Sequence, residues 1–301
     1  MSFEFFLKVF FGGLTKGSIY ALIALGYTMV YGIVKLINFA HGEIYMIGAF
    51  TALILIEALT VLNMPFVAII VCAVLVAMVS AAAYGYSMEK IAYKPVRSAP
   101  RLSALISAIG MSLFLQNYVR LAQTSSFLSF PKILPTFQFV EKVSYLNSSQ
   151  IIIYFFTVII MIGLTWYVNF TKTGVSMRAL SQDRVMAMLM GIKVDKIISI
   201  TFMIGSAIAA LGGILVSAYI GQINFYMGFL AGIKAFVAAV LGGIGNLPGA
   251  VLGSFILGFS ESFGTIFVSS DYEDVFAFIL LILILLFKPS GILGASEKEK
   301  V

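Results

Sequence analysis

Charged side chains are scarce in this sequence. Asp, Glu, Lys and Arg make up 11% of its 301 residues, against about 25% in an ordinary soluble domain, whereas hydrophobic residues make up 61%. A soluble protein of this size would need more charged residues to cover its surface. We therefore expect a polytopic membrane protein and not a soluble protein with a large core.

Histidine and cysteine are almost absent as well. The one cysteine, Cys72, has no partner for an internal disulfide, and His41 is the one histidine. No H-E-x-x-H or G-x-x-x-x-G-K-[ST] motif occurs, and the nearest run, GGLTKGS at 12–18, has its lysine before the glycine. These absences argue against a zinc enzyme and against ATP hydrolysis by this chain. We expect no catalytic residue, cofactor or metal in this chain.

Long apolar runs fill most of the chain instead. A helix that crosses the hydrocarbon layer needs about 20 residues, because each adds about 1.5 Å towards a thickness of about 30 Å. The sequence predicts an all-α fold with one membrane domain, 1–301, of about eight or nine transmembrane helices including broken ones. The runs are 9–30, 43–60, 65–86, 102–121, 150–170, 197–220, 229–243, 247–267 and 275–288. The first run is expected to remain as an uncleaved anchor.

The charges between these runs predict an orientation. Basic residues gather in 87–101 and 171–196, which the positive-inside rule places in the cytoplasm together with the tail from Lys288. Segments 122–149, 221–228 and 268–274 contain few or no basic residues and are expected outside. Nine full spans would place the N-terminus outside too, whereas a break at membrane depth would change the count and its side.

Helix packing is expected to depend on small residues and on one ion pair. Gly205, Ala209, Gly213, Ser217 and Gly221 recur at four-residue spacing, which allows helix backbones to approach closely. We expect this stripe to pack inside the chain, with a contact to a second membrane subunit as the alternative.

Lys234 and Glu261 lie on neighbouring apolar runs and are expected to pair, because unpaired charge inside a membrane is costly.

Two segments interrupt the apolar pattern, INFAHGEIYMIGAF at 37–50 and AAVLGGIGNLPGAVLGSFILG at 238–258. Irregular backbone at membrane depth survives only where protein or a water-filled cavity satisfies it, and broken helices in two halves of a chain indicate a transport path. We expect one group of residues to line or shape that path, with two ordinary interface turns as the alternative. The group is Asn38, His41, Gly42, Glu43, Gly242, Gly243, Gly245 and Asn246. For His41 and Glu43, a solvated loop just inside the membrane is the simpler expectation.

The segment 171–196, TKTGVSMRALSQDRVMAMLMGIKVDK, predicts a short helix between two spans. Ser176 to Met190 is expected to be helical, with Gly191 just past its end as a C-terminal stop. Met177, Leu180, Arg184 and Ala187–Met188 would then share a face. Further methionines and a leucine add apolar surface that suits docking into a groove on another protein.

The same segment resembles the coupling loop of the permease subunits of branched-chain amino acid ABC importers. Arg178, Ala179, Ala187, Gly191 and Ile192 match that family's pattern, and Asp183 stands at its acidic position. The stretch GLTKGSIYALIALGYTMVYGIVKLINFAHGEIYMIGAF and the second broken segment match too, so the resemblance covers nearly the whole chain. The opening G-x-x-x-G-x-x-Y-A-L-x-A-x-G is similar to the LivH type of the family.

This resemblance implies a role and a set of partners. The chain would form one half of a heterodimer with a LivM-type permease in the bacterial inner (plasma) membrane. Two ABC ATPase subunits would bind the coupling loops, and an extracytoplasmic binding protein would deliver leucine, isoleucine or valine. No nucleic acid is implied. The resemblance assigns ATPase coupling to Arg178, Ala179, Asp183, Arg184, Ala187 and Gly191.

Other transport functions stay open on the sequence alone. A related ABC permease could serve an amide, urea or a sugar, because specificity in such systems rests largely with the binding protein. A stand-alone channel or secondary carrier would need no coupling helix, but it would usually place partnered acidic groups deep in its spans. The sequence has few such groups.

Overall fold

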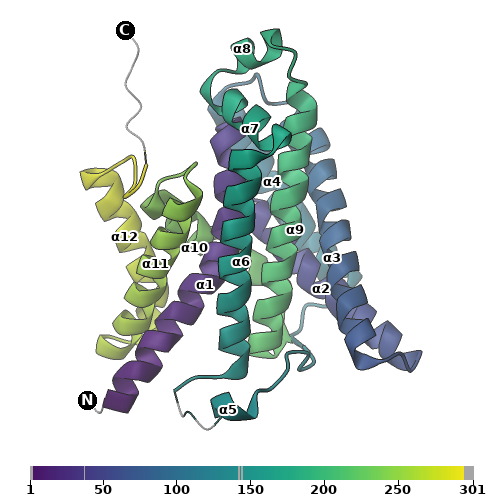
Figure 1. Cartoon of the computed structure of the whole chain (residues 1–301), viewed down its shortest axis with the longest axis vertical. Helices are drawn as coiled ribbons and strands as arrows, with labels where there is room; N and C mark the ends of the chain where they lie inside the picture. The colour runs from purple at the N-terminus through teal and green to yellow at the C-terminus, as the bar shows by residue number, and fades with distance from the viewer. Residues whose placement is uncertain (1–2, 37, 142, 144, 295–301) are drawn as a thin grey trace.

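The structure is a computed structural model that describes residues 3–36, 38–141, 143 and 145–294, and the described chain is mostly helical (Figure 1). Lys142 of the expected outer loop and the tail from 295 to 301 lie outside the described residues. The long helices are α1 (Phe3–Val34), α2 (His41–Val61), α3 (Phe66–Met88), α4 (Arg101–Ala122), α6 (Ser148–Phe170), α9 (Val194–Ile220) and α11 (Leu247–Phe267).

Shorter elements join and flank these helices. They are the π-helix η1 (Glu89–Tyr93), β1 (Leu128–Ser129), α5 (Gln138–Glu141), α7 (Lys172–Gln182), α8 (Arg184–Leu189), β2 (Gln222–Ile223), α10 (Met227–Gly242), the 3-10 helix η2 (Ser270–Tyr272) and α12 (Glu273–Phe287). The strands β1 and β2 form one small antiparallel pair, with Leu128 opposite Ile223.

Each of the nine apolar runs of the sequence is a helix. Seven described helices are long and apolar enough to cross a membrane, and α10 and α12 are shorter, with 16 and 15 residues. The polytopic all-α fold is therefore confirmed, with two short helices among the nine.

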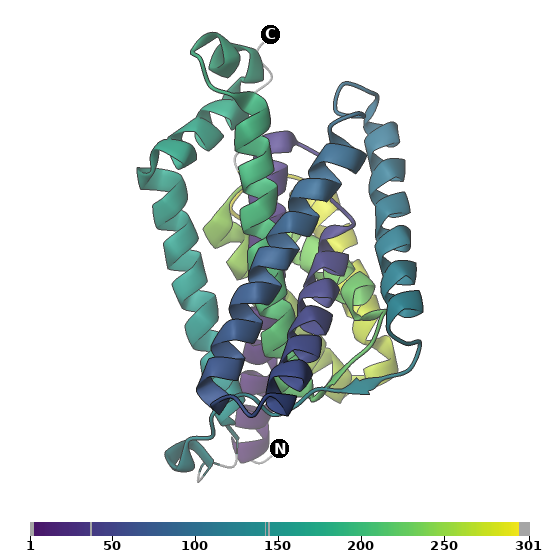
Figure 2. The same ribbon diagram turned by 90° about the vertical axis from the view of Figure 1, so that its right-hand side faces the viewer.

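The connecting segments lie at the two opposite ends of the helix bundle. Figures 1 and 2 show α7, α8 and the turn between α3 and α4 at one end, whereas α5 and the N-terminus lie at the other end. The two most basic connections therefore share one end, as the charge pattern predicts. The N-terminal end of α1 lies at the end of the bundle opposite α8 (Figure 1).

Helices α1 and α9 form the centre of the bundle. In their most apolar 18-residue windows, 72% of the residues of α1 and 78% of those of α9 are buried, against 22% in α3 and 17% in α6. Because α3 and α6 expose apolar side chains over most of their length, these two helices are suited to face lipid.

The glycines of the bundle allow the close packing that the sequence predicts. A methyl group at Gly213 would clash with the carbonyl oxygen of Tyr45, and one at Gly258 would clash with the backbone of Gly17. Lipid offers little hydrophobic drive for helix association, so such close approaches supply van der Waals contact instead. The stripe on α9 thus packs within this chain, at least at Gly213.

Candidate coupling site and buried polar cluster

The expected single helix from Ser176 to Met190 is two helices. The backbone breaks at Asp183, whose φ of −151° and ψ of 112° are extended. Its Oδ1 accepts hydrogen bonds from the backbone N–H groups of Val185 at 2.8 Å and Met186 at 2.9 Å, so Asp183 is the N-cap of α8. The continuous helix was wrong because an aspartate competes for nearby backbone donors and favours caps over helix interiors. Gly191 ends this segment in the left-handed region, with φ +81°, as expected.

Helix α8 exposes most of its side chains. An apolar surface, here called the α8 surface, consists of Val185, Met186, Met188, Leu189 and Met190, which are 55% to 83% exposed. Ala187 is buried and attaches the helix to the rest of the segment through its carbonyl oxygen, which accepts from the N–H of Ile192 at 3.1 Å. Exposed apolar side chains at one end of a bundle indicate a contact with another protein.

The break at Asp183 also changes which residues share a face. Met177 and Leu180 of α7 and Ala187 of α8 are buried, whereas Arg184 and Met188 are exposed. The expected common face is therefore divided between buried and exposed residues, since α8 does not continue the register of α7.

Arg178 lies on α7 beside the second broken segment. Its Nη1 donates to Asn169 Oδ1 at 3.0 Å, and Ala179 is partly buried on the same helix. Arg178 and Gly245 both line a cavity of about 70 Å³ next to Gly32 at the end of α1. The structure thus places one expected coupling residue beside one expected path residue.

The second broken segment is a tight turn between α10 and α11. Gly243 and Gly245 have φ of +104° and +99°, a region that favours glycine, and Asn246 caps α11 by accepting from Gly249 N–H at 3.2 Å. The carbonyl of Gly242 accepts from Leu293 N–H at 2.9 Å, so the segment after α12 covers the break. Protein groups therefore satisfy the polar backbone groups of this segment. The segment has the form of the tight turn that was the alternative expectation from the sequence.

The first broken segment is buried inside the bundle. His41 and Glu43 are 1% and 0% exposed in the first turn of α2, so the solvated loop expected for them was wrong. A methyl group at Gly42 would clash with the carbonyl oxygen of Gly228 on α10. The close approach of α2 to α10 at this glycine explains why the segment is covered by protein.

Polar side chains from several helices meet at this segment in what we call the buried polar cluster: Tyr27, Asn38, His41, Glu43 and Ser112. Ser112 donates to Glu43 Oε1 at 3.0 Å, and the ring of Tyr27 lies 4.8 Å from that of His41. Asn38 Oδ1 accepts from Tyr93 at 2.8 Å.

Four atoms of the cluster are buried without a hydrogen-bond partner among the described residues: Tyr27 Oη, Asn38 Nδ2, His41 Nε2 and Glu43 Oε2. Buried polar atoms are normally hydrogen-bonded. This cluster is therefore the part of the interior best suited to contact water or a polar solute.

The expected pair of Lys234 and Glu261 is present and belongs to a larger group. Lys234 Nζ lies 3.2 Å from Glu261 Oε1, and it also lies 2.9 Å from Glu273 and 2.9 Å from Asp274. Tyr20 donates to Glu261 Oε2 at 2.6 Å. The acids at the start of α12 were missed as partners because only the folded chain brings that helix beside α10.

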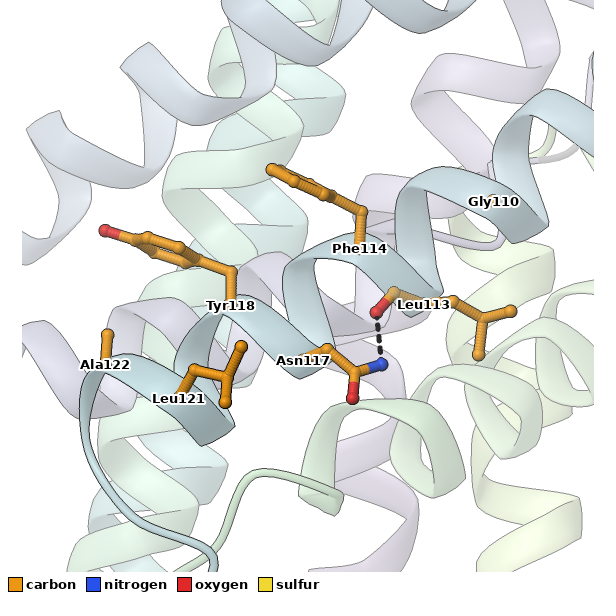
Figure 3. Close-up of a pocket in the computed structure, with 7 residues that line it drawn as sticks. All are labelled: Gly110, Leu113, Phe114, Asn117, Tyr118, Leu121 and Ala122. Atoms are coloured by element: carbon orange, nitrogen blue, oxygen red, sulfur yellow. Dashed lines mark hydrogen bonds between the residues drawn. The ribbon is translucent and has the colours of Figure 1, made fainter.

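An open groove of about 630 Å³ lies along one face of α4 (Figure 3). Its lining residues all belong to that helix: Gly110, Leu113, Phe114, Asn117, Tyr118, Leu121 and Ala122. Asn117 donates to the carbonyl of Leu113 in its own helix at 2.8 Å. None of the residues that the sequence singled out lines this groove, and its mostly apolar side chains suit contact with lipid or another membrane helix.

Comparison with known proteins gives the relatives of this chain. A family profile described as "Branched-chain amino acid transport system / permease component" matches residues 9–285. The chain is 48% identical to the high-affinity branched-chain amino acid transport system permease protein LivH of Escherichia coli, with 99% of each chain covered, and 47% identical to that of Salmonella typhimurium over the same share. It is 49% identical to the permease protein BraD of Pseudomonas aeruginosa, with 98% of each chain covered.

Among solved structures, PsaBC from Streptococcus pneumoniae in complex with Fab aligns over 94% of this chain and 90% of that chain at a TM-score of 0.41 and 12% identity. That similarity is too low to assign a shared fold. The profile match and the relatives extend over almost the whole sequence and agree with the multi-pass helical fold. This chain therefore belongs to the family of branched-chain amino acid transport system permease components.

Proposed function

We propose that this chain is the membrane-spanning permease subunit of an ATP-binding-cassette importer in the bacterial inner membrane. Its solutes would be leucine, isoleucine and valine, delivered by an extracytoplasmic binding protein, and separate ATPase subunits would hydrolyse ATP. The α8 surface is the observation that carries the proposal, because it exposes apolar side chains at the end of the bundle where the basic segments lie. The printed names of the relatives support the same class of solute.

The α8 surface would dock into a groove on an ATPase subunit. The helix has six residues, and the cap at Asp183 and the buried Ala187 hold it in place. Arg178, Ala179 and Arg184 would flank the contact, and Gly191 would connect it to α9. A displacement of α8 would therefore act directly on α9 and, through α7, on the turn between α10 and α11.

The translocation path would include the buried polar cluster and the second broken segment. Asn38, His41 and Glu43 would present polar atoms to the solute or to water, and Gly42 would let α2 approach α10. Gly242, Gly243, Gly245 and Asn246 would shape the inner end of the path beside Arg178. A LivM-type permease would form the other half of the path in a heterodimer.

The docking role is tested by making the α8 surface polar. In the Met186→Ser, Leu189→Ser, Met190→Ser triple variant, we expect membrane insertion to be retained, because these side chains are exposed. Retention of the ATPase subunits during purification should fall about tenfold or more, since a combined loss of about 1.4 kcal/mol over the three side chains already weakens binding tenfold.

The matched control replaces three exposed phenylalanines at the opposite end of the bundle, Phe127, Phe137 and Phe139, by serine. It should retain the ATPase subunits as the unmodified chain does. Equal retention by the α8 variant and this control would overturn the docking role.

Two single changes test the coupling segment by transport. Arg178→Ala or Ala187→Pro is expected to abolish ATP-linked uptake without loss of membrane insertion. Proline at 187 removes the N–H that donates to the carbonyl of Asp183 at 3.0 Å, and this disrupts α8. Uptake of radiolabelled leucine by cells is the measurement, and normal uptake by both variants would remove this segment from the mechanism.

Access to the path is tested by single cysteines in a Cys72→Ser background. Cysteines at 38, 41 and 243 are expected to react with a water-borne thiol reagent in at least one nucleotide state. Ala21, which is fully buried in α1, supplies the unreactive control. Inaccessibility of all the path positions in every state would contradict the assignment.

The class of solute is tested outside the membrane. The cognate binding protein is expected to retain leucine, isoleucine and valine in equilibrium dialysis. Retention of an amide, urea or a sugar in their place would assign the importer to that solute.

A further inference from the structure

Glu89 is a fully buried carboxylate that directly follows α3. It begins η1 and forms an ion pair with the guanidinium of Arg97. Ser199 on α9 donates to its Oε2 at 2.9 Å. A buried charge is costly unless it is paired and hydrogen-bonded, so these partners hold η1, the segment after it and α9 together.

Arg97 also connects this carboxylate to the start of α9. Its Nη1 donates to Asp195 Oδ1 at 2.8 Å, and Lys94 Nζ lies 2.8 Å from Asp195 Oδ2. The hydrogen bond with Asp195 raises the pKa of Lys94. We name the five residues Glu89, Lys94, Arg97, Asp195 and Ser199 the inner charge cluster. Asp195 stands in the first turn of α9, the helix that follows α8.

The far side of η1 is attached to α4. π-helices are rare and occur mostly as single turns at functional sites. Within η1 the carbonyl of Ala92 accepts from Ser107 of α4 at 2.6 Å. Further along α4, Ser112 donates to Glu43 of the buried polar cluster at 3.0 Å. Hydrogen bonds and ion pairs therefore connect the start of α9 with η1, then with α4, and then with Glu43.

We propose that Arg97 and Asp195 are positioning residues that transmit the displacement of α8 to α4, and through Ser112 to the buried polar cluster. This inference rests on the proposed function, in which α8 is displaced by an ATPase subunit. Arg97 is 6% exposed and binds both Glu89 and Asp195, so the first turn of α9 and the segment before α4 move as one body. Neither residue belongs to the α8 surface.

The test cuts the connection to α9 and leaves the buried ion pair intact. The double variant Asp195→Asn, Ser199→Ala removes the carboxylate of one residue and the hydroxyl of the other, but Glu89 keeps Arg97 as its partner. Asp195 is 49% exposed, so its neutralisation leaves no buried unpaired charge at that position. The matched control, Asp271→Asn, Ser270→Ala, makes the same chemical changes at two exposed residues of η2.

The first measurement is solute uptake per ATP hydrolysed by the complete complex in liposomes. We expect a fall of about fivefold or more in the double variant, the lower end of measured allosteric couplings, with the ATPase subunits still retained. The control and the conservative variant Asp195→Glu should behave as the unmodified complex. Unchanged uptake per ATP, or loss of the ATPase subunits, would overturn the proposal.

The second measurement does not depend on transport. Amide hydrogen exchange of residues 94–107 in the purified complex should be faster in the double variant than in the control, because that segment loses its attachment to α9. Equal exchange would overturn the proposal. If the unmodified complex took up no solute in an ATP-dependent way, the proposed function would fail, and hydrogen exchange alone would still decide whether the cluster positions α4.

Discussion

Single glycines set how closely α2 and α10 approach each other. At Gly42 a methyl group would clash with the carbonyl of Gly228 and lie 2.8 Å from the Cα of Gly232. Glycine within a helix usually loosens it, because glycine tolerates many conformations. In the structure Gly42 is helical, and the lack of a side chain is what allows the two helices to touch.

The change Gly42→Ala is therefore expected to destabilise the protein. Overpacking of a well-packed interior costs about 1–3 kcal/mol, which exceeds the gain of about 1 kcal/mol from replacing a helical glycine by alanine. Thermal unfolding of the purified protein in detergent measures the effect. Gly110→Ala on α4 is the control, because a methyl group there meets no atom within 4 Å, and it should leave the midpoint unchanged or raise it. Equal midpoints for the two variants would contradict this packing argument.

The charged residues show what a local pattern can predict. Lys234 and Glu261 stand on neighbouring apolar runs, and the cost of unpaired charge in a membrane was enough to predict their contact. Glu273 and Asp274 were assigned to a loop by composition, and their contact with Lys234 arises only when α12 packs beside α10.

At the scale of elements, the division between α7 and α8 depends on one side chain. Helical periodicity continues from Ser176 to Met190, so the pattern predicts one helix. Asp183 instead accepts two backbone N–H groups and starts a new helix. The new direction exposes the α8 surface and leaves Met177 and Leu180 buried.

Removal of this cap is expected to fray α8. Asp183→Ala should cost about 0.5–2 kcal/mol of helix stability, a large amount for six residues, whereas Asp183→Asn keeps a capping oxygen and serves as the control. The affinity of the purified permease for its ATPase subunits is the measurement. We expect weaker binding for the alanine variant and nearly unchanged binding for asparagine. Equal affinity for both would show that docking does not depend on the order of α8.

At the scale of the whole molecule, the two ends of the bundle carry different connections. The α8 surface and the turn between α3 and α4 share one end, and α5 and the start of α1 share the other. By the positive-inside rule, we expect the first of these ends to be cytoplasmic.

This orientation is expected to appear in labelling of single cysteines from either side of the membrane. In a Cys72→Ser background, a cysteine at Leu189 should react only from the cytoplasm, whereas cysteines at Phe3 and Phe139 should react from outside; all three native side chains are at least 76% exposed. Outside labelling of position 189 would reverse the topology and separate α8 from any cytoplasmic ATPase.

The sequence by itself determined the helical type and the places of the nine apolar elements, the charge bias of their connections and the family. Hydropathy, charge bias and motif spacing are local properties, so they can be recognised in the sequence without knowledge of the folded structure. Only the tertiary structure decided that His41 and Glu43 are buried and that Glu89, Arg97 and Asp195 form one cluster. Those contacts join distant residues, 98 apart for Arg97 and Asp195 and 110 apart for Glu89 and Ser199, and they form because a buried carboxylate requires a partner wherever the fold supplies one.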